Sequence, residues 1–243
     1  MIPGRPCYRR ILLKLSGEAL MGETPYGIDP GMLNGVAEQI HAVHLMGVDI
    51  AVVVGGGNIF RGLRAAEYGM ERVPADHMGM LATVINAIAM GAAIRSAGSE
   101  TRILSAVEMN KVAEPYIRAR ALRHLEKGRI ILLAGGTGSP YFSTDTAAAL
   151  RALEIGAEAL LKATKVKGVY SADPVKEPSA LFYPTLTYQE VLERNLKVLD
   201  MAAIALSMAQ GLPVVVFNLL EWGNIEKVIM GEQVGTLISG GTT

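Results

Sequence analysis

Short apolar runs alternate with amphipathic segments along almost the whole chain. Runs this short, bounded by glycine or proline, are typical of buried strands, whereas the amphipathic segments have helical spacing. The alternation predicts an α/β fold, a three-layer sandwich in which helices cover both faces of a mainly parallel central sheet. The expected strands lie near Ile11–Leu15, Val48–Val54, Thr101–Ser105, Arg129–Ala134, Ala159–Lys162 and Pro213–Asn218.

Capping residues predict where several helices begin. Asp29-Pro30 is a helix start, with Gly47 at the corresponding end. Other helices are expected to begin at Asp76, near Glu114 and at Thr144-Asp145, and the segment Thr187–Glu190 has the spacing of a capping box. Between Lys165 and Pro184 the apolar residues thin out, which predicts a long surface excursion. If the chain has two lobes, we expect the division near residue 155.

Composition excludes several classes of protein. The 243 residues include 23 basic and 23 acidic side chains, so no net field attracts nucleic acid or an anionic membrane. A single cysteine, Cys7, excludes a disulfide framework within the chain and fits a reducing compartment, which places the protein in the cytoplasm. Lys14 interrupts the first apolar run, so that run is expected to be a strand and not a signal peptide.

The longest apolar segment, Met78–Ile94, is apolar around nearly its whole circumference. Its core, Met80–Ile94, is interrupted by Thr83 and Asn86 and is expected to be too short to span a bilayer. Two explanations stay open from composition, burial against another subunit or a central position within one chain.

Two glycine-rich turns each follow a predicted strand, Gly55-Gly56-Gly57-Asn58 and Gly135-Gly136-Thr137-Gly138. Glycine lets backbone N–H groups approach an anion, and a helix beginning after such a turn adds its positive end. A third strand, Ile11–Leu15, carries Lys14, a cation suited to a transferring phosphoryl group. The complete P-loop and G-x-G-x-x-G patterns are absent. The hypothesis is phosphoryl transfer between two phosphate-bearing molecules.

Individual polar residues allow two interpretations. Arg61 can fold back over an anion at the triple glycine or lie in solvent at a helix end. Asp145 can cap a helix or orient a lysine or a metal near the anion sites. Asp76, His77 and Asp200 also precede or open helices, where a structural capping role is an alternative to a functional one.

Five segments together resemble the bacterial uridylate kinases of the amino-acid kinase superfamily. They are Lys14–Glu18, Gly55–Gly62, Ala75–Thr83, Gly136–Asp145 and Lys162–Pro174. The resemblance runs from about Tyr8 to about Ser239 and implies one domain over residues 8–239, with a UMP-binding lobe to about residue 155 and an ATP-binding lobe after it. It also implies phosphorylation of UMP to UDP in pyrimidine nucleotide biosynthesis, with ATP and Mg²⁺, by a homohexamer that GTP activates and UTP inhibits.

The resemblance further implies roles for particular residues. Lys14, Arg61 and Asp145 would be catalytic, whereas the metal ligands stay open. ATP would contact Lys14, Leu15, Ser16, Gly17, Gly57, Arg61, Thr164, Tyr170 and Asp173. UMP would contact Gly56, Asp76, Thr137, Gly138, Ser139, Pro140, Tyr141, Phe142, Ser143 and Thr144. The GTP-responsive segment would be Gly22, Glu23, Thr24, Pro25, Tyr26 and Gly27.

Two other functions remain as alternatives. One is a carboxylate or carbamate kinase of the same superfamily, against which Asp76 and the Thr137–Thr144 segment argue. The other is a nonenzymatic nucleotide sensor or oxyanion storage protein, which has no need of a cation for a transition state. Lys14, Arg61 and Asp145 argue against it.

Overall fold

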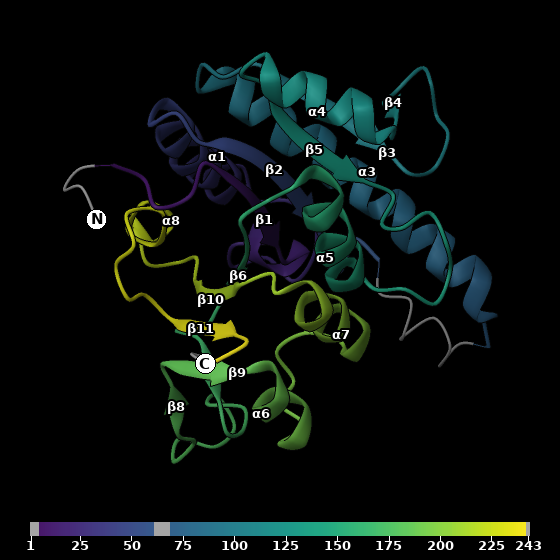
Figure 1. Ribbon diagram of the computed structural model, residues 1–243. Coiled ribbons are helices and arrows are strands. Elements are labelled where there is room, and N and C mark those ends of the chain that lie inside the picture. Colours follow the sequence, from purple (N-terminus) through teal and green to yellow (C-terminus); the bar gives the residue numbers. More distant parts are fainter. Residues whose placement is uncertain (1–4, 61–68, 242–243) are drawn as a thin grey trace.

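The computed structural model describes residues 5–60 and 69–241, and Figure 1 shows the strands of one long twisted sheet flanked by helices. In the described chain this sheet has nine strands, in the order β4-β3-β5-β2-β1-β6-β10-β11-β9, and every adjacent pair is parallel except β10 with β11. Its strands are β1 (Arg10–Leu15), β2 (Asp49–Val54), β3 (Thr101–Ser105), β4 (Glu114–Pro115), β5 (Ile130–Ala134), β6 (Ala159–Thr164), β9 (Thr185–Thr187), β10 (Val214–Asn218) and β11 (Thr236–Ser239).

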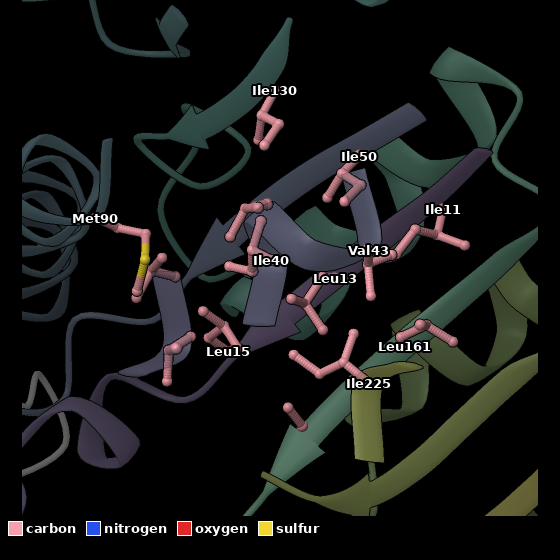
Figure 2. Packing of buried hydrophobic residues seen from close by; sticks show 14 of the residues in the cluster. Ile11, Leu13, Leu15, Ile40, Val43, Ile50, Met90, Ile130, Leu161 and Ile225 are labelled. Atoms are coloured by element: carbon pink, nitrogen blue, oxygen red, sulfur yellow. The ribbon is translucent and has the colours of Figure 1, made fainter. Parts of the chain in front are cut away.

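Helices cover both faces of the sheet, as the sequence predicts. One apolar cluster joins the sheet to α1 (Pro30–Leu45), α3 (Arg72–Ser96) and α8 (Asn224–Ile229), and Figure 2 shows part of it, including Leu13, Ile40, Met90 and Ile225. A second cluster joins the opposite face to α4 (Arg118–Glu126), α5 (Thr144–Ile155), α6 (Tyr188–Glu193) and α7 (Met201–Gln210). A short 3-10 helix, η1 (Gly17–Leu20), follows β1.

Successive side chains of β1 point to opposite faces, and this alternation places Lys14. Ile11, Leu13 and Leu15 enter the cluster with α1, α3 and α8, whereas Leu12 enters the cluster with α5. Lys14 is two residues beyond Leu12 and therefore faces α5 near the carboxyl end of the strand.

Several local predictions are confirmed. Asp29 caps α1 by accepting from the backbone N–H of Met32, with Pro30 in the first turn. Thr187 and Glu190 form the expected capping box at α6. The six predicted strands correspond to β1, β2, β3, β5, β6 and β10.

Two predictions of helix starts are wrong in part, and the predicted excursion has structure of its own. The helix expected at Asp76 begins at Arg72, so Asp76 lies inside α3. Glu114 and Pro115 form β4, and the helix begins at Arg118, because the segment pairs with β3 before it turns. The excursion between Lys165 and Pro184 contains a two-stranded antiparallel sheet of β7 (Val169–Tyr170) and β8 (Phe182–Tyr183).

The apolar stretch that the sequence predicts to be too short to span a bilayer lies within a longer helix, α3. Among the described residues, α3 alone is long and apolar enough to cross a membrane by length and composition, and 56% of its most apolar window is buried within the protein. Its two polar interruptions are buried: Thr83 accepts from the N–H of Gly135, and Asn86 is fully enclosed. On the other side, Met78, Leu81, Ile85 and Ile88 are exposed, so α3 is both a core helix and an uncovered apolar surface.

Candidate active site

The candidate functional residues lie together at the carboxyl edge of the parallel sheet. Lys14 is near the end of β1, the triple-glycine turn follows β2, and the second glycine turn follows β5. Lys162 and Thr164 lie at the end of β6. Parallel strands bring their carboxyl ends to one edge, where ligands of open α/β sheets bind. The sheet thus assembles segments that are far apart in the sequence.

Lys14, Asp145 and Lys162 form a buried ion triad at this edge. Lys14 and Lys162 occupy paired positions on the adjacent strands β1 and β6. The Nζ of Lys14 lies 2.6 Å from Oδ1 of Asp145, and the Nζ of Lys162 lies 2.7 Å from Oδ2. Lys162 also donates to the carbonyl of Val198. One carboxylate therefore separates and orients two ammonium groups.

Burial and charge act together on this triad. Burial by itself raises the pKa of Asp145, but the two ammonium groups outweigh it and hold the pKa below the ordinary 3.8. Burial lowers the pKa of Lys162, the Asp145 carboxylate opposes this, and the positive charge of Lys14 adds to the lowering. Because two cations share one anion, the triad carries one excess positive charge, which suits a phosphate-bearing ligand.

The start of α5 decides which interpretation of Asp145 holds. Ser143 is the N-cap, and its hydroxyl oxygen accepts from the N–H groups of Asp145 and Thr146. Asp145 is therefore released from capping and reaches the lysines. The carboxylate of Asp200 caps α7 and accepts from the hydroxyls of Ser143 and Thr146, which ties the first turns of α5 and α7 together.

A cavity of about 550 Å³ adjoins Lys162. Thr164, Tyr170 and Asp173, the residues predicted for the adenine nucleotide, all line it, together with Lys197. Most of its wall comes from the segment between Lys165 and Pro184, which contains β7 and which the sequence predicts as a surface excursion. An apolar pocket with a few polar groups at the mouth of a parallel sheet is the usual form of a small-molecule site.

A smaller cavity, of about 130 Å³, lies beside the triple-glycine turn. Gly56, Asp76, Phe142 and Thr144, all predicted for UMP, line it with Gly57 and Gly136. Gly57 thus lies with these residues, although the resemblance implies a contact with ATP. A Cβ on Gly56 would lie 2.9 Å from the carbonyl oxygen of Gly79 on α3, so only glycine allows α3 this close. Thr144 is adjacent to Asp145, which brings the smaller cavity next to the triad.

Asp76 and the glycine turn after β5 are joined through Tyr141. The backbone N–H of Tyr141 donates to Oδ2 of Asp76 at 2.7 Å, and Tyr141 has a φ of +72°. Arg72 donates to both Asp76 oxygens and lies over the Tyr141 ring. Asp76 is therefore a fixed acceptor beside the smaller cavity.

The remaining predicted residues are placed as follows. Leu15 is fully buried in the core, so its backbone alone is available to a nucleotide, and Ser16 precedes η1. Thr137 and Ser139 bond to each other within the second glycine turn. Gly27 pairs with Asn58, which brings the Gly22–Gly27 segment next to the triple glycine. Arg61 lies outside the described residues, as does the rest of the segment 61–68, whereas Ile59 and Phe60 still bond to the carbonyl of Gly56.

The sequence analysis missed a role for two charged residues of the site. Lys162 is quoted there only as part of a motif, although its position at the end of a buried strand, like that of Lys14, is a usable signal. Asp200 is considered there both as a cap and as a functional residue, but its second contact, to α5, depends on tertiary packing and has no local signal.

The fold agrees with comparisons to known proteins. The model of the amino acid kinase family matches residues 9–218, and the chain belongs to this family. The chain is similar to the solved structure of a UMP kinase from Bacillus anthracis, with 40% identity, 98% of each chain covered and a TM-score of 0.93. It is also similar to a UMP kinase from Ureaplasma parvum, with 36% identity, 95% of this chain and 98% of that chain covered and a TM-score of 0.89. A uridylate kinase from Archaeoglobus fulgidus matches at 30% identity, over 94% of this chain and 99% of that one, with a TM-score of 0.72.

Proposed function

We propose that this chain is a nucleoside monophosphate kinase that transfers the γ-phosphoryl group of ATP to UMP, giving ADP and UDP in pyrimidine nucleotide biosynthesis. The observation that carries the proposal is the buried triad of Lys14, Asp145 and Lys162, with a cavity next to each end. Membership of the amino acid kinase family and the similarity to UMP kinases support the reaction and the substrate.

In this proposal the two nucleotides bind on opposite sides of the triad. ATP occupies the larger cavity, formed mainly after residue 155, with its phosphates directed toward Lys14, Ser16 and Gly17. UMP occupies the smaller cavity, formed before residue 155, with Asp76 accepting from the ribose hydroxyls. The smaller volume suits a pyrimidine monophosphate once its phosphate extends out toward Lys14.

The reaction needs no protein nucleophile. A phosphate oxygen of UMP attacks the γ-phosphorus of ATP, the bond from that phosphorus to the β,γ-bridging oxygen breaks, and ADP leaves with that electron pair. Lys14 and Lys162 neutralise the charge that develops on the transferring group, while the N–H groups of the glycine turn face its oxygens. Asp145 holds both lysines in place before the substrates bind. Arg61 would add a third cation.

Mg²⁺ would accompany ATP and would be held by phosphate oxygens and water together with one or two carboxylates, the usual arrangement in kinases. The described residues contain no group of three or more His, Cys, Asp or Glu side chains that could hold a metal ion. Asp145 is occupied by two lysines and Asp200 by two hydroxyls and a backbone N–H. The ion would supply further neutralisation of the β- and γ-phosphates.

We also propose that the chain assembles into a homohexamer and is regulated by UTP and GTP. Met78, Leu81, Ile85 and Ile88 lie on one face of α3 at helical spacing and are exposed, which supports burial of this face in a homohexamer. UTP would inhibit from the UMP site, and GTP would activate through the Gly22–Gly27 segment. A cytoplasmic location is also part of the proposal, and the single cysteine, Cys7, supports it.

A substrate panel tests the function directly. ADP release is measured with ATP and Mg²⁺ against UMP, CMP, dUMP, acetylglutamate, aspartate and carbamate. We expect turnover with UMP to exceed turnover with each carboxylate and with carbamate by at least about a hundredfold, because the smaller cavity positions a nucleotide. Preference for a carboxylate or carbamate would establish the alternative kinase, and nucleotide binding without turnover would establish the sensor or storage protein.

A further inference from the structure

Two buried asparagines form a closed pair of amides beneath the triple-glycine turn. Asn58 follows the turn directly, and Asn86 lies in the middle of α3; their exposed fractions are 2% and 0%. The Nδ2 of Asn58 donates to Oδ1 of Asn86 at 3.0 Å, and the Nδ2 of Asn86 donates to Oδ1 of Asn58 at 2.7 Å. Each side chain therefore both donates to and accepts from the other.

The second hydrogen of each amide goes to a backbone carbonyl. Asn58 donates to the carbonyl oxygen of Gly27 at 2.8 Å, and Asn86 donates to that of Gly55 at 2.6 Å. All four amide hydrogens thus have acceptors, three of them in the interior of the protein and the fourth on the partly buried Gly27. A polar network that is complete and excluded from water fixes a single arrangement, because any shift leaves a buried group unpaired.

This network determines the position of the turn. The N–H of Gly55 donates to the carbonyl of Leu15 on β1 at 2.9 Å, so the peptide units of Gly55 are held on one side by β1 and on the other by Asn86 of α3. Gly17 fits closely against the same atoms: a Cβ there would lie 2.4 Å from Oδ1 of Asn58 and 2.5 Å from the carbonyl oxygen of Gly55. The turns after β1 and β2 therefore pack on the amide pair.

We infer that Asn86 is a positioning residue for phosphoryl transfer. Through the carbonyl of Gly55 it orients the N–H of Gly56, which belongs to the same peptide unit, toward the transferring phosphate, although its own side chain is enclosed and touches no nucleotide. Asp76, the proposed hydrogen-bond acceptor for UMP, lies on the same helix. Helix α3 therefore fixes Asp76 and the triple-glycine turn relative to each other. This role rests on the proposed transfer of phosphate to UMP.

The test compares Asn86→Asp with Thr101→Val. Aspartate keeps the shape of asparagine but has no N–H to offer Gly55 and Asn58. Thr101 is equally buried and bonds to the carbonyl of Gly91 on α3, but it begins β3 at the opposite edge of the sheet. Asn86→Asp removes hydrogen bonds that α3 donates to the glycine turn, and Thr101→Val removes one that β3 donates to α3. Both variants therefore weaken the packing of α3 on the sheet, but only Asn86→Asp does so at the turn.

We expect kcat of Asn86→Asp to fall at least about tenfold at a temperature where circular dichroism shows it folded, with KM for UMP changed by less than about threefold. Thr101→Val retains the wild-type kcat. Hydrogen exchange of the 50–60 peptide accelerates in Asn86→Asp and is unchanged in Thr101→Val. A smaller loss of kcat, or unchanged exchange of that peptide, overturns the inference.

Asn86→Ser covers the case in which Asn86→Asp fails to fold. Serine keeps one donor hydrogen and leaves room for water, and we expect kcat to fall at least about threefold with the same acceleration of exchange. Wild-type kcat in a folded Asn86→Ser overturns the role. Absence of UDP formation by the wild-type protein refutes the proposed function, whereas UDP formation by the wild type and by Asn86→Asp at equal kcat refutes only the positioning role.

Discussion

Lys14 and Lys162 lie side by side at paired positions of two parallel strands, and each holds a different oxygen of the same carboxylate, that of Asp145. Two ammonium groups this close repel each other unless an anion lies between them. Asp145 supplies that anion from the first turn of α5. A phosphoryl group that reaches this edge of the sheet meets two cations already fixed in place, so little reorganisation is needed during transfer.

The first prediction concerns acid stability and Asp145→Asn. The pKa of Asp145 is lower in the folded chain than its ordinary 3.8, so the folded state binds this proton more weakly than the unfolded state does. The contribution to the free energy of unfolding is complete above 3.8 and is lost as the pH falls through the folded pKa. Urea unfolding should therefore show a difference between wild type and Asp145→Asn that is nearly constant from about pH 6 to about pH 5 and shrinks as the pH falls from about 4 to about 2. A difference that stays constant over this range contradicts the ion triad.

Asp76→Asn should weaken UMP binding more than ATP binding. Asparagine retains one acceptor oxygen for the N–H of Tyr141 but removes the charge that the ribose hydroxyls would meet. Because the variant loses the hydrogen bond from the ribose to a charged group, we expect KM for UMP to rise by about ten- to a hundredfold. The matched control is Asp49→Asn, which also breaks an aspartate–arginine pair but at the amino end of β2. An increase confined to KM for ATP contradicts the assignment.

Ile85→Glu should disrupt the proposed hexamer. Ile85 is at the centre of the exposed apolar face of α3, and a carboxylate buried in a subunit contact lacks a partner. Light scattering should show a hexamer for the wild type and a smaller species for the variant at micromolar protein. The control is Leu45→Glu, at an exposed leucine at the end of α1, which should leave the mass of the assembly unchanged. A monomeric wild type refutes the assembly.

UTP should compete with UMP and not with GTP. The smaller cavity, with Asp76 and Phe142, is proposed to take the uridine, and a triphosphate can extend from it toward Lys14. If the sites overlap, UMP weakens the binding of UTP by the same factor by which UTP weakens the binding of UMP. Equilibrium dialysis should show UMP displacing labelled UTP but not labelled GTP. Saturation of each subunit with one UMP and one UTP at once excludes the shared site.

The strands and caps were predictable because they depend on local sequence. The apolar run before Lys14 and the Thr187–Glu190 capping box act within a few residues. The short strands β4 and β9 were not predictable from the sequence. Glu114–Pro115 and Thr185–Thr187 become strands only because the fold places a neighbouring strand beside them. Asp76 has a side chain suited to begin a helix, yet α3 begins one turn earlier, where Glu71 has no side-chain capping bond.

The site was predictable where a residue lies at or just after the carboxyl end of a strand, as with Lys14 and the glycine turns. Lys162 also follows that rule, but its pairing with Asp145 depends on the order of β1 and β6 in the sheet, which no local pattern contains. The amide pair of Asn58 and Asn86 was hidden for a similar reason: Asn86 interrupts an apolar helix, and only the packing of α3 on the glycine turn gives it partners.

Turnover of Lys14→Ala tests the central claim most directly. UDP formation from ATP and UMP is measured by ³¹P NMR for wild type, Lys14→Ala and Lys227→Ala, an exposed lysine on α8. Because the ammonium of Lys14 acts mainly on charge that develops during transfer, we expect Lys14→Ala to remain folded and to lose at least about a hundredfold in kcat, while Lys227→Ala retains wild-type kcat. Wild-type kcat in folded Lys14→Ala would contradict the account.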